Sequence, residues 1–412
     1  MKSSVANLEL PFGANRTKSE SKIQGKNLSV VGLFAGIGGV ERGLGRSGHE
    51  ALLFCEIDQP AQAVLRSRFK NVPIVDDVRK MVSLPRSVDL LTGGFPCQDL
   101  SQAGKAEGIL KGKNSSLVTE IFRLVQKTSV PNVLLENVPF MLRLDGGRAM
   151  SVLAEAFEKL GYKWAYRVVN SMSFGVPQRR ERVLFLASAE IDPRTVLFAD
   201  EAHPLEKKVN SVGSVACGFY WTEGIRGLGW AVNGVPTLKG GSTIGIPSPP
   251  AIVFPDGLVG TPDIRDAERM QGFPAGWTKP ASTVARESHR WKLVGNAVTV
   301  GVFSWVGKRL KSPTTRGMDV AGWAKKDSEP WADAGWNIGS GRYSASLTRF
   351  PLQEKEIDLV DWLRYPVKPL SERATAGFLA RAKKGSLNFP DRFIVTLEKH
   401  LSKMRKEAPA SR

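Results

Sequence analysis

An apolar run that ends in a glycine-rich turn constrains this chain more than any other feature. Residues 28–34 (LSVVGLF) have the length of a buried strand, and the turn 35–39 (AGIGG) leads into a helix-like stretch that reaches Gly48. Glycines in such a turn let the backbone approach a ligand, and the start of the helix offers free N–H groups. The pattern indicates a site for a nucleotide-containing cofactor in an α/β domain.

A second strand supports this interpretation. Residues 51–55 are apolar and end in Glu56, about 20 residues beyond the first glycine of the turn. An acidic residue at this spacing typically binds ribose hydroxyls. The spacing does not separate a dinucleotide from S-adenosylmethionine, so both remain open at this point.

Strand-like and helix-like segments continue to alternate along the first half of the chain. We expect a doubly wound, mostly parallel, Rossmann-like α/β sheet over residues 28–188. The expected helices are 59–69, 116–128 and 148–160, and the further strands are 72–75, 88–91, 133–135, 163–170 and 182–187. Beyond them we expect an irregular β-rich domain (189–262), a helical return to the first domain (263–310) and a C-terminal extension of mixed loop and helix (311–412).

A lone cysteine stands where an open α/β sheet binds its ligands. Cys97 follows the strand 88–91 and precedes a polar loop, and ligands bind at the carboxyl ends of such strands. Its position alone leaves two readings open, a nucleophile or a small core residue. Glu136 ends the next strand and should lie at the same edge. Arg180 and Arg182 are two apart on a strand, face the same way and suit a phosphate or a polar base edge.

Charge and composition narrow the class of partner. The chain carries 58 Lys and Arg against 40 Asp and Glu, a net charge of +18, which favours nucleic acid over a merely soluble basic surface. No apolar run approaches the roughly 20 residues of a membrane helix. Residues 1–27 lack a signal-peptide pattern and read as a disordered arm. Three scattered cysteines without a CxxC pair indicate neither zinc nor disulfides, so no metal is expected and a reducing cytoplasm fits.

Six ordered motifs make the chain resemble the DNA (cytosine-5) methyltransferases. They span residues 28 to about 310 and leave 1–27 and 311–412 unmatched. The motifs are residues 34–39 (FAGIGG), 93–98 (GGFPCQ) with Ser101, Ala103 and Gly104, 136–138 (ENV), 178–182 (QRRER), 269–274 (RMQGFP) and 295–298 (GNAV).

The resemblance implies a role for each matching residue. Cys97 would be the nucleophile, Glu136 the cytosine-binding acid and Arg180 a further anchor beside them. Contacts to DNA would come from Gln98, Ser101, Lys105 and Arg182. Asp76 departs from the pattern, because glycine is frequent there. S-adenosylmethionine, which leaves as S-adenosylhomocysteine, would be bound by Phe34, Gly36, Ile37, Gly38, Gly39, Glu56, Ile57, Asp77, Val78, Phe95, Pro96, Asn296 and Val298.

The resemblance also implies an activity and its partners. We expect a cytoplasmic monomer that methylates carbon 5 of a flipped-out cytosine in double-stranded DNA through a covalent cysteine adduct. Residues 189–262 would recognise the target, and a cognate restriction endonuclease would act at the same site. A tRNA methyltransferase and an inactive DNA-binding relative are the alternatives. For residues 311–412 we expect added DNA contact, with buttressing of the fold as the other reading.

Overall fold

The computed structural model describes residues 25–95, 117–203, 212–241 and 247–407. Most of the predicted N-terminal arm lies outside these ranges, and so do Pro96, Cys97, Gln98, Ser101 and Lys105. Within the described ranges, no helix combines the length and the apolar character needed to cross a membrane.

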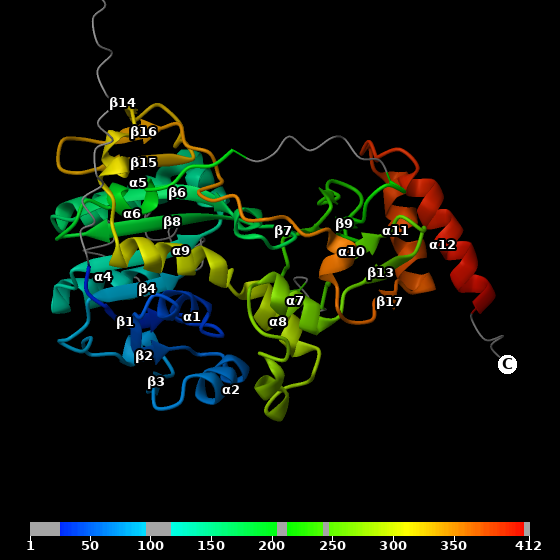
Figure 1. Cartoon of the computed structure of the whole chain (residues 1–412), viewed down its shortest axis with the longest axis horizontal. Coiled ribbons are helices and arrows are strands. Elements are labelled where there is room, and N and C mark those ends of the chain that lie inside the picture. The colour runs from blue at the N-terminus through cyan, green and yellow to red at the C-terminus, as the bar shows by residue number, and fades with distance from the viewer. Residues whose placement is uncertain (1–24, 96–116, 204–211, 242–246, 408–412) are drawn as a thin grey trace, which may run out of the picture.

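A ten-stranded mixed sheet forms the larger of two lobes (Figure 1). Its order is β14-β16-β15-β6-β8-β5-β4-β1-β2-β3. The neighbouring strands from β3 to β5 in this order pair in parallel. The neighbouring strands from β5 through β8 and β6 to β14 pair antiparallel. The expectation of a mostly parallel sheet is therefore corrected to a mixed one. The strands are β1 (Ser29–Leu33), β2 (Glu50–Cys55), β3 (Ile74–Val75), β4 (Leu90–Gly94), β5 (Asn132–Asn137), β6 (Lys163–Asn170), β8 (Glu181–Ser188), β14 (Gly322–Ala324), β15 (Ala334–Asn337) and β16 (Tyr343–Ala345).

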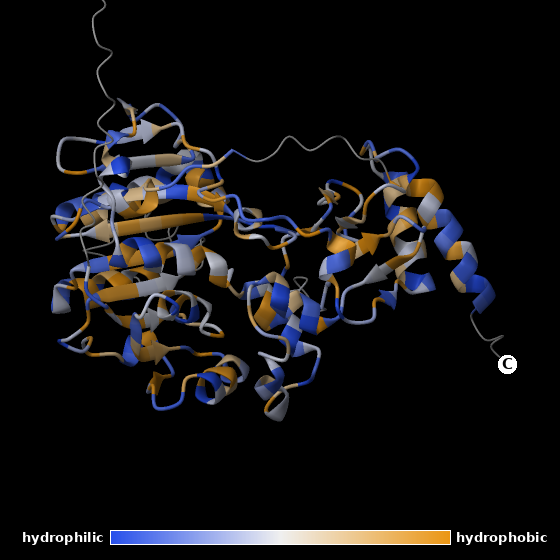
Figure 2. Ribbon diagram, viewed as in Figure 1, coloured by the Kyte–Doolittle hydropathy of each residue, from blue (hydrophilic) through white to orange (hydrophobic). Residues whose placement is uncertain are grey.

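Helices cover both faces of this sheet. Neighbouring residues of β1 point to opposite sides, so Val31 joins the core beneath α4 (Leu117–Thr128) and α5 (Arg148–Lys159). Val30 joins the core beneath α1 (Gly39–Gly45), α6 (Arg194–Leu197) and α9 (Val300–Lys311). Figure 2 shows hydrophobic colour along the central strands, where both faces are buried. The two cores confirm the doubly wound arrangement.

The strands β14 to β16 lie in a segment that was expected to hold only loop and helix. β15 pairs with β6, and β16 and β14 extend the sheet beyond it. Trp331 and Trp336 are buried against this edge. Strands of three or four residues rich in glycine and serine show no usable period, and they obtain their hydrogen bonds from β6, which is distant in sequence. Tertiary pairing therefore decides their conformation.

The smaller lobe is a five-stranded sheet, at the right of Figure 1, with the order β10-β9-β12-β13-β17. One face packs on α11 (Glu372–Lys384) and α12 (Phe393–Glu407), through side chains such as Phe378 and Phe393. The other face packs on α7 (Ile264–Met270), α8 (His289–Asn296) and α10 (Leu359–Trp362). The strands are β9 (Cys217–Phe219), β10 (Ala231–Val232), β12 (Ala251–Val253), β13 (Val259–Thr261) and β17 (Lys368–Pro369).

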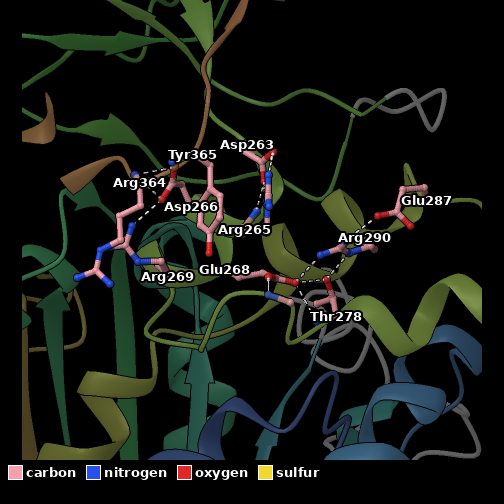
Figure 3. A network of polar contacts seen from close by, with 11 residues as sticks. Asp263, Arg265, Asp266, Glu268, Arg269, Thr278, Glu287, Arg290, Arg364 and Tyr365 are labelled. Carbon is pink, nitrogen blue, oxygen red and sulfur yellow. Dashed lines mark hydrogen bonds and ion pairs between the residues drawn. The ribbon is translucent and has the colours of Figure 1, made fainter. Parts of the chain in front are cut away.

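A polar network on α7 ties distant segments together (Figure 3). The Asp266 carboxylate is fully buried, accepts hydrogen bonds from the backbone N–H groups of Arg364 and Tyr365, and pairs with Arg269. Helix α7 is thereby joined to a segment about a hundred residues later in the chain. The C-terminal segment that follows β16 is fixed to α7 by these bonds.

The second half of the network centres on Glu268, which is also fully buried. Its carboxylate pairs with Arg290 of α8 at 3.0 Å and accepts the Thr278 N–H at 2.8 Å. The expected helical return over 263–310 is divided at this point. Helix α8 ends at Asn296, and α9 begins at Val300 after an extended link. Glu268 thus positions the helix that precedes this link.

Two further elements complete the frame of the site. The helix α2 (Gln59–Arg68) begins at Asp58, whose carboxylate accepts the Ala61 N–H, and Pro60 occupies its first turn. A two-stranded parallel ladder of β7 (Gln178–Arg179) and β11 (Val235–Pro236) bridges the two lobes.

Candidate active site

The strand register places Glu136 beside the start of the segment that carries Cys97. In the parallel pair β4–β5, Glu136 lies opposite Gly94, where a Cβ would come within 3.3 Å of the Glu136 carboxylate. The Asn137 side chain donates a hydrogen bond to the Phe95 carbonyl at 3.0 Å. Cys97 itself lies outside the described residues, two positions after Phe95.

Of two arginines near β7 and β8, one contacts the Glu136 carboxylate and the other is held by backbone carbonyls. Arg182 Nε lies 2.6 Å from Glu136 Oε1, and both side chains are mostly buried. Arg180 is 2% exposed and donates instead to the carbonyls of Leu238 and Gly295, at 3.3 Å each. Arg182, expected to contact DNA, is therefore the arginine in contact with Glu136. Both face one pocket, as their spacing predicted.

Burial sets the electrostatics of Arg180. Its removal from water lowers the pKa of the guanidinium, the neighbouring Arg182 lowers it further, and Glu136 acts in the opposite sense. A guanidinium nevertheless stays protonated in proteins. Arg180 Nε has no hydrogen-bond acceptor among the described residues. The pocket therefore contains a buried cation with a free donor.

The glycine turn and Glu56 form the other end of the site. Phe34, Gly36 and Gly38 all have positive φ, which folds the chain sharply between β1 and α1. The Glu56 carboxylate accepts the Gly36 N–H at 2.7 Å and the Asp58 N–H at 2.8 Å. Burial raises the pKa of Glu56, while these two backbone donors lower it. The carboxylate thus joins the ends of β1 and β2.

These two ends line a single pocket of about 470 Å³. Of the predicted site residues, it brings together Phe34, Gly36, Ile37, Glu56, Phe95, Glu136, Arg180, Arg182 and Asn296. The volume lies within the range of small-molecule sites. Residues far apart in the sequence, from Phe34 to Ala297, therefore close one cavity at the carboxyl edge of β1, β4 and β5.

The remaining described candidates do not line the pocket. Gly39 packs against Val298, where a Cβ would meet the valine at 2.7 Å, and Gly38 packs against α2. The Asp77 carboxylate caps the turn at residues 78–80 and pairs with Arg79, which lowers the pKa of Asp77. Val78 is buried in the core, and Ile57 is 65% exposed.

Sequence reasoning missed a pair of opposite charges that lines the same pocket. Lys292 of α8 pairs with Asp58 at 3.1 Å, so the pair joins the two sides of the pocket. His289 Nε2 lies 3.4 Å from the same carboxylate. The position of Asp58 two residues after Glu56 was a usable signal, but nothing near Lys292 indicated its partner.

The large sheet and its covering helices have the fold of an α/β methyltransferase. The methyltransferase Dnmt2 of S. pombe has the same fold, with a TM-score of 0.50 and 17% identity over 69% of this chain and 98% of that one. A model of the C-5 cytosine-specific DNA methylase family matches residues 28–215.

Two curated relatives extend the comparison beyond the matched segment. The type II methyltransferase M2.BsuMI of Bacillus subtilis (strain 168) is 46% identical over 384 residues, which cover 90% of this chain and 98% of the relative. The type II methyltransferase M.Bsp6I of Bacillus sp. (strain RFL6) is 29% identical over 315 residues, 69% of this chain and 98% of the relative. The chain belongs to the C-5 cytosine-specific DNA methylase family.

Proposed function

We propose that the chain transfers a methyl group from S-adenosylmethionine to carbon 5 of a flipped-out cytosine in double-stranded DNA. In this proposal it serves as the site-specific modification enzyme of a restriction–modification system. The observation that carries the proposal is the one pocket that unites Glu56 with Glu136 and its partner Arg182. Gly94 and Phe95 line the same pocket, and Cys97 follows Phe95 by two positions in the sequence. Membership of the family and the type II relatives support it.

The donor groups of the pocket fit S-adenosylmethionine. Glu56 offers a carboxylate to ribose hydroxyls, Lys292 a cation, and Asn296 an amide, while Phe34 and Leu293 supply apolar walls. A Cβ on Gly36 would meet nothing within 4 Å, so the turn leaves open space beside Glu56. When bound, this cofactor supplies an electrophilic methyl group to the activated carbon 5.

The protein groups activate the cytosine. Carbon 5 is a poor nucleophile, and addition of the Cys97 thiolate to carbon 6 makes it electron-rich, so one hard step becomes two easier ones. Negative charge then develops toward ring nitrogen 3, where Glu136 would hold a proton. A base removes the carbon 5 proton, the bond to carbon 6 breaks and the Cys97 thiolate is released.

The arginines orient this acid in a desolvated site. Arg182 fixes the Glu136 carboxylate at 2.6 Å, and the free Nε–H of buried Arg180 is available to a polar atom of the base. Donors held in place before the reaction cost no reorganisation during it. Because a stacked base cannot reach a buried pocket, the cytosine must leave the duplex.

Bisulfite sequencing of DNA from cells that express the chain tests the proposal. We expect methylated cytosine at one short sequence, and none in cells that express Cys97→Ser, because a serine hydroxyl is not deprotonated at neutral pH as a thiol is. Duplex DNA containing 5-fluorocytosine should trap a covalent adduct with the parent only. An adduct with Cys97→Ser, or methylation confined to added tRNA, would contradict the proposal.

A kinetic comparison tests Glu136 separately. Glu136→Gln should bind duplex DNA and S-adenosylhomocysteine as the parent does and lose about 10²–10⁴-fold in single-turnover rate, because an amide cannot deliver the proton. A parental single-turnover rate would remove Glu136 from this role.

A further inference from the structure

A loop of the small lobe is shaped by the C-terminal helix α11. The loop, residues 220–229, joins β9 to β10 and is closed internally by the Gly224 N–H, which donates to the Gly227 carbonyl at 3.0 Å. The Arg381 guanidinium donates to two of its carbonyls, Trp221 O at 2.7 Å and Glu223 O at 2.9 Å. One side chain of α11 therefore fixes two peptide planes of the loop, those that follow Trp221 and Glu223.

Close packing reinforces this contact. Gly224 has φ +116°, and a Cβ there would approach the Phe378 ring of α11 at 3.1 Å. At the end of α11, a Cβ on Gly385 would meet the Ile225 carbonyl at 2.8 Å. Side chains larger than glycine would push the loop and the helix apart. The conformation of the 220–229 loop thus depends on a segment some 150 residues later in the chain.

The same loop is linked to the catalytic pocket through Lys239. The Lys239 ammonium pairs with Glu223 and lies 3.6 Å from the centre of the Tyr220 ring, and the Tyr220 hydroxyl donates to Thr237 O at 2.7 Å. The neighbouring Leu238 carbonyl accepts from Arg180 in the pocket. Residues 237–239 therefore connect the 220–229 loop to Arg180 of the pocket.

The outer side of the loop carries groups suited to DNA. Ile225 is 46% exposed, and Arg226 is exposed with no hydrogen bond or ion pair to any part of the chain that the structure describes. Both line an open hollow of about 570 Å³ together with Arg381. Arg179, exposed on β7, adds a second cation near Tyr220. A free arginine beside an apolar side chain matches a phosphate next to a base edge.

We propose that the 220–229 loop contacts the DNA flanking the target cytosine, and that Arg381 is a positioning residue for this contact. The proposal rests on the proposed function, because a duplex whose cytosine enters the pocket must lie against the segments around it. Figure 1 shows α12 at the outer end of the small lobe, away from the large sheet. The C-terminal helices then act on recognition through the loop and not through the lysines of α12.

Two variants test the two parts of the proposal. Arg226→Ala should weaken binding to any duplex and reduce the slope of log affinity against log salt by about one, as expected for one lost phosphate contact. Arg381→Ala should release the loop, raise KM for DNA with little change in kcat, and reduce discrimination between the methylated sequence and single-base variants about tenfold. Arg381→Lys should recover little, since an ammonium lacks the planar fork that reaches two carbonyls.

Arg405→Ala is the matched control. Arg405 lies on α12, and among the described residues its side chain pairs with exposed Glu372 alone. The substitution removes the same charge as Arg381→Ala, so neither the salt slope nor the discrimination should change. Binding of S-adenosylhomocysteine, measured by calorimetry, should equal the parental value in all variants. Parental salt slope in Arg226→Ala, or parental discrimination in a folded Arg381→Ala, would overturn the proposal.

The outcomes separate this proposal from the proposed function. If Arg381→Ala does not fold, the salt slope of Arg226→Ala decides alone. If the parent methylates no DNA, the proposed function fails, while the salt slope on a non-specific duplex still decides whether the loop contacts DNA.

Discussion

Replacement of Glu41 by glutamine should make the protein more stable at pH 8 and leave its stability near pH 4.5 almost unchanged. Glu41 lies on α1 and is 5% exposed. Its Oε1 accepts a hydrogen bond from the Thr92 hydroxyl at 3.0 Å and rests on Gly32, while Oε2 has no partner among the described residues. This burial raises the pKa of Glu41 from 4.5 to about 7.

The sign and size of the effect follow from proton linkage. Because the folded protein holds this proton more tightly than the unfolded chain, the free energy of unfolding falls as pH rises from 4.5 to about 7 and is then constant. A separation of roughly 2.5 pH units, at about 1.36 kcal/mol each, gives a loss of about 3 kcal/mol. Glutamine keeps the acceptor for Thr92 and carries no charge, so the variant should escape this loss.

Urea unfolding followed by circular dichroism between pH 5 and 8.5 measures the difference. Glu155→Gln is the matched control, because Glu155 is exposed on α5 and its substitution should leave the pH profile of the parent intact. If Glu41→Gln shows the same fall in stability with pH as the parent, the carboxyl of Glu41 is not neutral in the folded protein and the reasoning is wrong.

Two further substitutions probe the frame of the site. Arg290→Met leaves the Glu268 carboxylate buried without its cation, so urea titration should show a loss of about 3–5 kcal/mol in the free energy of unfolding. The double variant that also carries Glu268→Gln should recover part of this loss, and equal losses in the two variants would contradict a charge effect. Gly295→Ala would place a Cβ 2.1 Å from the Lys239 backbone, so calorimetry should show weaker binding of S-adenosylhomocysteine, and unchanged affinity would show that this contact can relax.

The sequence was sufficient for the parts of the site that stand at the ends of long, regular elements. Glu56 follows β2 and Glu136 lies near the end of β5, and these two strands have six residues each. Their apolar runs placed both carboxylates at one edge of the sheet, where the structure has them. The period of two also predicted that Arg180 and Arg182 face one pocket. It could not show which arginine contacts Glu136, because this depends on the turn between β7 and β8 and on the carbonyls that engage Arg180.

The C-terminal quarter shows where sequence reasoning failed and why. Helix was expected in this segment, and residues such as Phe393 and Leu397 form an apolar stripe by which α12 packs on the small lobe. Its partner, the small sheet, is built from strands of two or three residues, which give no periodic signal, and all of them except β17 lie more than a hundred residues away. The role of residues 311–412 cannot be tested cleanly by removing them, because a truncation near residue 312 would also remove β14 to β16 from the large sheet. Point substitutions such as Arg381→Ala test that role without this loss.

The path of the chain between the lobes limits how the small lobe can change by recombination. Its sheet comes from residues 217–261 and 368–369, while about half of the core on one face of that sheet comes from α11 and α12. The segment between these parts contains α9 and β14 to β16, which belong to the large lobe, besides α7, α8 and α10, which pack on the small sheet. A single exchanged gene fragment would therefore carry only one half of a hydrophobic core. Transfer of the small lobe between relatives requires two separate segments to move together, with Arg381 and the 220–229 loop inherited as a pair.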